Sequence, residues 1–561
     1  MTTSTTATTT EDHANAQKQS NHTEKMSTGF AEAININKEQ TARKSRRRLA
    51  QFYKGKNILI TGATGFIGKV CLVKLVKSLA NCGTIYVMLR PKRGMTPQQR
   101  FNKMLNEPPF TVSNGFRESD NDVKEAELIS DSSGGNIDWS KIVAIEGDMS
   151  CEDLGFADDV KRELCKSVHI VFNIAASVQF DAPLKQNLRD NYLGSRNFLK
   201  LATKFENLVS YLHVSTFFVN SHISHVEEKV LPMKNDCEKM ADLIQWMPDK
   251  LCDQATPHLL EDRPNTYIFT KAMSENLVQS YEGKLPLAIL RPSIVVPAKA
   301  EPIPGWVDNV NGPMGLGVLA SLGILRNIDW NYYGVSDFIP VDTVVNSMLA
   351  VAERTTRLYP KQIKVYNCSS SSLNPTTWGQ TFELLRGESQ KAPPYKMLRL
   401  PIAPPRHKRA NKIGFALSKV SELLFAYFID FILMLCGQKQ ILTKLTKKLH
   451  HGYDILLPFT TNEYTCDNDN IVAAFEELDD GDKEEFDFDI RQIDWASGIV
   501  DAYYGARKRL LKEDISNVSA AVFKMKILTV LNYLFQIILY SSIGWYFYKS
   551  YGADLIYTHP N

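Results

Sequence analysis

The sequence predicts an α/β protein with a Rossmann-type, doubly wound parallel sheet, a mainly helical C-terminal domain and a C-terminal transmembrane helix. The short apolar run 58–60 leads directly into a glycine-rich turn and then into an apolar-periodic stretch at 70–79, which is the pattern of strand, turn and helix. Further strand-like runs alternate with helical stretches as far as Leu290. After about Ser370 this alternation stops, and an uncharged apolar segment follows near the end of the chain.

Composition and periodicity divide the chain into four parts. Residues 1–50 contain few large apolar side chains and cannot bury enough surface to offset the entropy of ordering, so we expect a disordered leader. Residues 51–370 are expected to form the Rossmann domain, residues 371–515 the helical domain and residues 527–548 a membrane anchor. The candidate strands of the Rossmann domain are 58–60, 84–89, 142–145, 170–174, 208–214 and 287–290.

The charge and cysteine content exclude several classes of protein. The 65 basic and 62 acidic residues leave a net charge of +3, which is too small for a protein built to bind nucleic acid. The nine cysteines are scattered without C-x-x-C spacing, so neither a zinc site nor a disulfide framework is indicated. Residues 1–51 lack the apolar stretch of a secretory signal. We therefore expect a cytosolic catalytic region without a metal site.

The segment Ile527–Tyr548 is expected to span a membrane once, as a C-terminal anchor. Its 22 uncharged residues would reach roughly 33 Å as a helix, against a hydrocarbon core of about 30 Å. It ends in four aromatic residues and follows several basic ones, which places the preceding domains on the cytosolic side. A buried C-terminal helix, which Asn532 and Gln536 favour, is the alternative. The endoplasmic reticulum, the peroxisomal membrane and lipid droplets all remain open as locations.

Two further segments bear on membrane contact. Val420–Cys436 is apolar but carries Glu422 and Asp430, so it is too short and too acidic to span a bilayer and predicts a buried or membrane-dipping helix. Gln438–His451 alternates apolar and basic residues. It is expected either to contact a membrane or the phosphates of a ligand, or to be a solvated cationic helix face.

A glycine signature for a dinucleotide lies between the first strand and the first helix. Gly62 permits the tight turn, Gly65 lets a pyrophosphate approach the amides at the helix start, and Gly68 allows the helix to pack closely on the strand. The expected cofactor-binding residues of this turn are Thr61, Gly62, Thr64, Gly65, Phe66, Ile67 and Gly68.

The loop after the second strand predicts the choice of cofactor. It offers Arg90, Lys92 and Arg93 and no acid, which favours the 2′-phosphate of NADPH over the free ribose of NADH, with Arg90 as its first candidate partner. Asp148, after the third strand, is a candidate to hydrogen-bond the adenine. The alternative interpretation, an ordinary loop aspartate, is nearly as good. Asn173, at the end of the fourth strand, is expected to line the nicotinamide side of the cleft.

The catalytic candidates are a tyrosine, a lysine and a hydroxyl. Tyr267 and Lys271 are four residues apart on an expected helix, so they share a face, and the ammonium can favour the proton-donating or ionised phenol. Ser215 and Thr216 follow the fifth strand, where a hydroxyl can hold a reacting carbonyl oxygen. The sequence does not say which of the two points inward; we favour Ser215.

These motifs together resemble the extended short-chain dehydrogenase/reductase superfamily, and further segments resemble the fatty acyl-CoA reductase family within it. The resemblance covers about Asn57 to Asp514. Its segments are LRPSIV at 290–295, PGWVDN at 304–309, DFIPVD at 337–342, NPTTWG at 374–379, FDFDIRQIDW at 486–495 and GARK at 505–508.

The resemblance implies reduction of long-chain fatty acyl-CoA to fatty alcohol with two NADPH, as in the synthesis of wax or ether-lipid precursors. The first hydride would reach the thioester carbonyl. The oxyanion that forms would be held by Tyr267 and by Ser215 or Thr216. Expulsion of the CoA thiolate would then give an aldehyde. A second hydride, with Tyr267 as proton donor, would give the alcohol. Lys271 would lower the tyrosine pKa and hold the nicotinamide ribose. The apolar segment 314–331 is expected to border the cleft, without a readable limit on chain length.

Two other functions stay open at the level of sequence. A membrane-anchored hydroxysteroid-type dehydrogenase would share the glycine turn, Tyr267 and Lys271, but it would not need residues 370–514. A non-catalytic NADPH-binding scaffold would not need the intact tyrosine, lysine and hydroxyl set. The sequence carries no signal for oligomeric state.

Overall fold

The computed structural model describes residues 48–92, 94–113, 138–325, 329–359, 362–401, 408–514 and 518–552. Two sequence predictions therefore concern residues wholly or largely outside the described ones: the leader at 1–50 and Arg93.

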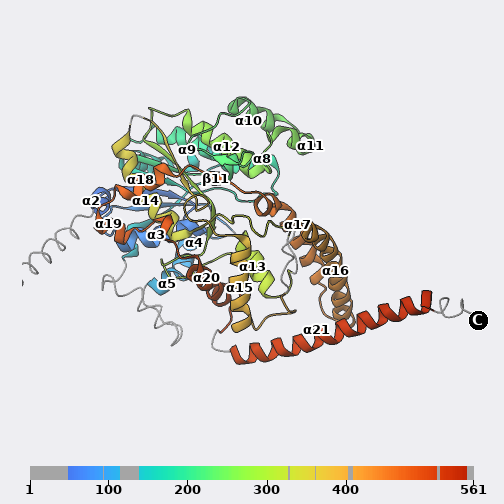
Figure 1. Ribbon diagram of the computed structural model, residues 1–561. Coiled ribbons are helices and arrows are strands. Elements are labelled where there is room, and N and C mark those ends of the chain that lie inside the picture. Colours follow the sequence, from blue (N-terminus) through green and yellow to red (C-terminus); the bar gives the residue numbers. More distant parts are fainter. Residues whose placement is uncertain are drawn as a thin grey trace, which may run out of the picture.

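A seven-stranded parallel sheet forms the centre of the molecule, in the order β10-β7-β5-β4-β1-β2-β3 (Figure 1). Its strands are β1 Asn57–Thr61, β2 Ile85–Leu89, β3 Ile142–Glu146, β4 Val168–Asn173, β5 Ser210–Val214, β7 Leu287–Pro292 and β10 Lys364–Cys368. The order reverses between β1 and β4, and a crevice at such a switch point is where this architecture holds nucleotides. The predicted doubly wound sheet is confirmed.

Helices cover both faces of the sheet because the strand side chains alternate in direction. Ile58 and Ile60 of β1 pack into one apolar cluster with α3 and α14, whereas Leu59 packs into a second cluster with α9 and α12. The helices of this domain are α2 Arg48–Tyr53, α3 Phe66–Ser78, α4 Pro97–Leu105, α5 Phe110–Ser113, α7 Asp158–Ser167, α8 Leu184–Asn187, α9 Gly194–Ala202, α10 Cys237–Trp246, α11 Asp249–Leu259, α12 Thr266–Gln279 and α14 Val341–Leu358.

The region after β10 is mainly helical, as the sequence predicts. The short strand pair of β6 His225–Val226 with β11 Thr465–Cys466 ties it to the Rossmann part. A second short pair, β8 Ile294–Val296 with β9 Phe338–Pro340, lies before β10. Its helices, with α13 from the earlier segment, are α13 Pro313–Ser321, α15 Trp378–Lys391, α16 Lys408–Leu435, α17 Leu442–Thr461, α18 Asp469–Glu476, α19 Asp480–Glu485, α20 Trp495–Arg509 and α21 Val518–Phe547.

Two segments expose long apolar faces. Val420–Cys436 lies mostly within α16 and is not buried, since Val420, Leu424 and Phe428 are 59%, 64% and 60% exposed. Helix α21 extends along one side of the molecule (Figure 1), and its apolar side chains are also exposed. The stretch from Val518 to Ser550 is long and apolar enough to cross a membrane, and its exposure contradicts the alternative of a buried C-terminal helix.

Candidate functional site

The glycine turn has the shape of a dinucleotide cradle. Gly62 has φ +74° and lies so close to β4 that a Cβ there would approach the backbone nitrogen of Ala175 to 2.8 Å. A Cβ on Gly68 would overlap the Gly62 carbonyl, so only glycine lets α3 start against β1. Gly65 is the N-cap of α3 and contributes no side-chain cap. The first amides of α3 therefore stay available to a diphosphate.

Two arginines meet beyond β2, at the adenosine end of the cradle. The Arg90 side chain is 61% exposed, and its guanidinium lies 3.9 Å from the carboxylate of Asp148. The guanidinium of Arg100, on α4, donates to the Arg90 carbonyl. Burial and the neighbouring Arg90 cation lower the pKa of Arg100. Two positive charges held close together favour an anion between them. Of the two arginines, the sequence analysis named only Arg90 as a candidate partner of the cofactor phosphate.

Asp148 and Asn173 make contacts within the protein that compete with their expected roles in binding the cofactor. One carboxylate oxygen of Asp148 accepts from the Ser150 amide and hydroxyl, at 2.9 and 2.8 Å, as in an ordinary loop turn. Its other oxygen faces Arg90. Asn173 is 1% exposed, and its amide is used internally by Thr61 and His213. Both residues therefore shape the cleft through neighbouring side chains.

A buried chain of hydrogen bonds links the glycine turn to the catalytic helix. The Thr61 hydroxyl accepts from the Ala175 amide (3.1 Å) and donates to Asn173 Oδ1 (2.9 Å). Asn173 Nδ2 lies 3.2 Å from His213 Nδ1, and His213 Nε2 lies 3.5 Å from Lys271 Nζ. Lys271 also donates to the Val214 carbonyl at 2.7 Å. The chain fixes the position of the lysine amine.

Burial changes the acidity of the catalytic groups. Lys271 is 2% exposed, and burial lowers its pKa to about 8, against an opposing effect of the Glu275 carboxylate. Burial and the Lys271 cation hold the pKa of His213 well below its ordinary value, so the imidazole is neutral. Burial raises the pKa of Tyr267 to about 12, while a hydrogen bond with the Thr216 hydroxyl lowers it. Tyr267 is therefore a proton donor at neutral pH.

The two hydroxyl candidates differ in what they contact. Thr216 bonds to Tyr267 and also accepts from the Phe218 amide at 3.4 Å. The hydroxyl of Ser215 is buried and has no hydrogen-bond partner in the described part of the protein. Of the two hydroxyls, that of Thr216 therefore lies beside Tyr267, and the choice between Ser215 and Thr216 as the catalytic hydroxyl stays a prediction.

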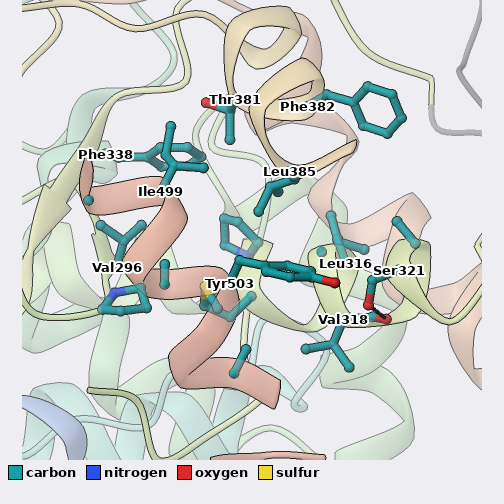
Figure 2. Close-up of a pocket in the computed structure, with 18 of the residues that line it drawn as sticks. Val296, Leu316, Val318, Ser321, Phe338, Thr381, Phe382, Leu385, Ile499 and Tyr503 are labelled. Carbon is teal, nitrogen blue, oxygen red and sulfur yellow. Dashed lines mark hydrogen bonds between the residues drawn. The ribbon is translucent and has the colours of Figure 1, made fainter. Parts of the chain in front are cut away.

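A large apolar cavity lies between α13, α15 and α20. Its space is about 1440 Å³ including the open mouth. Figure 2 shows Leu316 and Val318 of α13, Leu385 of α15 and Tyr503 of α20 around it. The segment expected to border the cleft contributes Met314, Leu316, Val318 and Trp330.

One layer of side chains separates the cavity from Tyr267, the candidate catalytic tyrosine. The Phe180 ring meets Tyr267 edge-on at 5.3 Å and contacts Phe459 at 5.6 Å. The next residue on α17, Thr460, lines the cavity. Ile294 packs both against the cluster that contains Tyr267 and against a cluster of cavity residues that includes Trp330. The cavity and Tyr267 thus share an apolar wall.

A dinucleotide cradle, a tyrosine–lysine pair and an apolar cavity define a Rossmann-type reductase of the short-chain dehydrogenase class. The family model described as "Male sterility protein" matches residues 60–348, a NAD(P)-binding domain, and a second model of the same description matches residues 421–513. The chain is 35% identical over 491 residues to fatty acyl-CoA reductase 1 of Rattus norvegicus, covering 88% of this chain and 92% of the relative. Fatty acyl-CoA reductase 2 of Bos taurus is 36% identical over 497 residues, at 89% and 92% coverage.

The chain belongs to the fatty acyl-CoA reductase family. Solved structures show the same fold at low identity. The terminal R domain from the myxalamid PKS-NRPS pathway has a TM-score of 0.51 and 18% identity, covering 82% of this chain and 92% of that one. The reductase domain of a non-ribosomal peptide synthetase from Mycobacterium tuberculosis has a TM-score of 0.52 and 16% identity, at the same coverage.

The structure brings together most of the sequence candidates and adds three features that sequence reasoning missed. The glycine turn, Tyr267, Lys271 and Thr216 gather around the crevice between β1 and β4. Arg100, His213 and the apolar cavity were not predicted. A basic residue on the helix after the cofactor loop and a histidine two residues before Ser215 were visible in the sequence. Neither had a spacing rule that marked it.

Proposed function

We propose that the protein reduces long-chain fatty acyl-CoA to fatty alcohol with two molecules of NADPH, releasing CoA. The observation that carries this proposal is the shared apolar wall between Tyr267 and the cavity. A non-catalytic scaffold leaves this cavity unexplained, and a hydroxysteroid-type dehydrogenase would not need residues 370–514. Membership of the family supports the thioester substrate.

The residues around the crevice suit two successive carbonyl reductions. NADPH, when bound, supplies the hydride for each one. The hydroxyls of Thr216 and Tyr267, which hydrogen-bond to each other, would donate to a carbonyl oxygen as negative charge develops on it. The raised pKa of Tyr267 keeps its proton until an alkoxide of comparable basicity forms, as in the aldehyde step. Lys271, held by Val214 and His213, would supply a cation near the reacting groups.

Two guanidinium groups support NADPH as the reductant. Arg90 and Arg100 lie at the end of β2, where the adenosine ribose of a dinucleotide is bound in this fold. Their mutual repulsion would be relieved by a 2′-phosphate, and NADH has no group to do so. An NAD-specific loop is expected to offer an acidic residue to the ribose, and residues 90–93 contain none.

The cavity is the proposed site of the acyl chain. Helix α13 contributes Leu316 and Val318, α15 contributes Leu385, and α20 contributes Ile499 and Ala502. Each buried methylene of a ligand contributes about 0.8 kcal/mol, so a long chain gains much of its affinity here. The charged CoA would remain outside this apolar wall.

The C-terminal helix α21 is the proposed membrane anchor, with the catalytic region on the cytosolic side. Its length, its apolar composition and the exposure of its side chains support this placement. A catalytic unit held at a bilayer suits a substrate and a product that both partition into lipid.

The decisive experiment incubates the full-length protein, in detergent or vesicles, with palmitoyl-CoA and NADPH and measures hexadecanol, free CoA and NADPH consumed. We expect two NADPH oxidised for each alcohol and CoA formed. Tyr267→Phe should abolish turnover and keep NADPH binding, measured by fluorescence enhancement. Oxidation of a sterol with NAD⁺ and no acyl-CoA turnover would establish the dehydrogenase alternative. Activity that survives in Tyr267→Phe would refute the mechanism.

A further inference from the structure

The hairpin of α16 and α17 is built with its polar side inward. Glu422 on α16 is 4% exposed, and its carboxylate lies 2.9 Å from His450 Nε2 on α17. Asp430, 6% exposed, accepts from the three backbone amides of residues 441–443 at 3.1, 3.0 and 2.8 Å and so caps the start of α17. Lys419 donates to Asp454 at 2.6 Å. Polar contacts therefore fix the two helices to each other.

The apolar side of α16 points away from the protein. Its exposed residues recur every three or four positions, which puts them on one helix face. A helix of a water-soluble protein buries such a face and exposes its carboxylates, so the order here is reversed. The residues of this outer face are Leu417, Val420, Leu424, Phe428, Phe431 and Leu435, each between 53% and 69% exposed.

A band of lysines borders the outer face. Between Asp430 and Asp454 the chain carries four lysines and no acid. They are Lys439, Lys444, Lys447 and Lys448, all of them exposed. Lys447 Nζ lies 5.6 Å from the centre of the Tyr427 ring, beside the outer face. Long cationic side chains next to an exposed apolar stripe match the boundary between acyl chains and anionic headgroups.

We propose that the α16–α17 hairpin is a second membrane contact, with the outer face of α16 among lipid acyl chains and the four lysines against anionic headgroups. The proposal rests on the proposed anchoring by α21, which already places the chain at a bilayer. The opposite charge of the lysines and headgroups, and the continuity with that anchor, select lipid over a second copy of the chain or another apolar protein.

The hairpin also connects the membrane to the substrate cavity. Helix α17 has 20 residues and is about 30 Å long. One end carries the hairpin tip, and at the other Thr460 lines the cavity while Phe459 contacts the ring of Phe180 beside Tyr267. Contact of the tip with lipid would therefore set the distance of the acyl site from the bilayer.

The native cysteines provide a direct test. Cys436 follows α16 at the hairpin tip, and Cys151 lies in the loop after β3; both are exposed. Full-length protein in vesicles of phosphatidylcholine and phosphatidylserine would carry an NBD label on Cys436 in a Cys151→Ser variant, or on Cys151 in a Cys436→Ser variant. Mass spectrometry would verify the labelled site. We expect blue-shifted emission and at least threefold stronger quenching by doxyl-labelled lipids at Cys436. Equal emission and quenching at the two sites would overturn the proposal.

A matched pair of variants separates lipid contact from other outcomes. Leu424→Glu with Phe431→Glu should remove the quenching at Cys436, because both side chains belong to the outer face. Trp246→Glu with Leu251→Glu should keep it, since these exposed residues lie on α10 and α11, away from α21 (Figure 1). Energy transfer between labels on two chains, without lipid quenching, would show a second copy instead and overturn the proposal.

The proposed function is read out separately in the same samples. Reduction of palmitoyl-CoA in detergent should be retained by both double variants. Loss of quenching with retained reduction supports the hairpin as a lipid contact. Absence of reduction in the unmodified chain would refute the proposed function and leave the fluorescence result standing on its own.

Discussion

The acidity of Lys271 predicts how activity depends on pH. Burial lowers its pKa from 10.5 to about 8, which corresponds to roughly 3 kcal/mol against the ammonium form. The ammonium therefore dominates below pH 8 and is lost above it. Between pH 7 and pH 9 its fraction falls from about nine-tenths to about one-tenth, so a rate that needs this cation should fall roughly tenfold.

A substitution of Glu275 tests whether Lys271 causes this fall in activity at alkaline pH. Glu275 raises the pKa of Lys271 and pairs with the buried Arg291 at 2.6 Å. Glu275→Gln removes the negative charge and leaves the arginine cation, so the alkaline fall should move to lower pH. Glu282→Gln, at an exposed carboxylate just beyond the same helix, should leave the profile unchanged.

The assay is kcat/KM for NADPH at saturating palmitoyl-CoA from pH 6.5 to 9.5, at constant ionic strength. This ratio reports groups of the enzyme before NADPH binds. Blanks without enzyme correct for decay of NADPH and of the thioester. A flat profile up to pH 9.5, or a fall that moves to higher pH in Glu275→Gln, would refute the assignment to Lys271.

Four more outcomes follow from the site. Thr216→Val should lower kcat by about 10²- to 10³-fold, as expected for a lost oxyanion donor, whereas Ser215→Ala should lower it less than tenfold. A larger loss of kcat in Ser215→Ala, measured by steady-state kinetics, would favour Ser215 as the catalytic hydroxyl. Arg100→Ala should raise KM for NADPH about tenfold or more and leave KM for NADH unchanged. Leu385→Trp should shorten the cavity by about two methylenes and shift the kcat/KM ratio of stearoyl- to myristoyl-CoA roughly tenfold toward the shorter chain. Arg291→Met should destabilise the fold by about 3–5 kcal/mol, seen as a lower midpoint of thermal unfolding, because a buried carboxylate loses its partner.

The features that the sequence predicted well have causes local to a few consecutive residues. The strand–turn–helix of β1 and α3 follows from apolar periodicity and from a backbone that only glycine can adopt at Gly62. The tyrosine–lysine pair follows from the geometry of one helix, since residues four apart share a face. Such rules need no knowledge of the rest of the fold, so they hold before the tertiary structure is known.

The features that it did not predict depend on which distant segments meet. Arg100 stands beside Arg90 only because α4 returns to the end of β2. Which of the hydroxyls of Ser215 and Thr216 meets Tyr267 depends on where α12 lies, and their order in the chain does not reveal it. The apolar residues of Val420–Cys436 indicated contact with something apolar, and only their exposure shows that the part of the chain which the structure describes does not cover them.

The proposed membrane anchor and the proposed acyl cavity are tied to each other by short covalent and polar links. Glu513 lies 3.1 Å from Arg507, which lines the cavity, and also accepts from the Lys396 amide at 2.8 Å. Val518, the first residue of α21, is five residues further on, so it stays within about 18 Å of Glu513 even in a fully extended chain. Lys524 on α21 donates to the carbonyl of Tyr395. An anchor tethered this closely holds the cavity near the lipid surface, and a long-chain alcohol formed there would have only a short path into the bilayer.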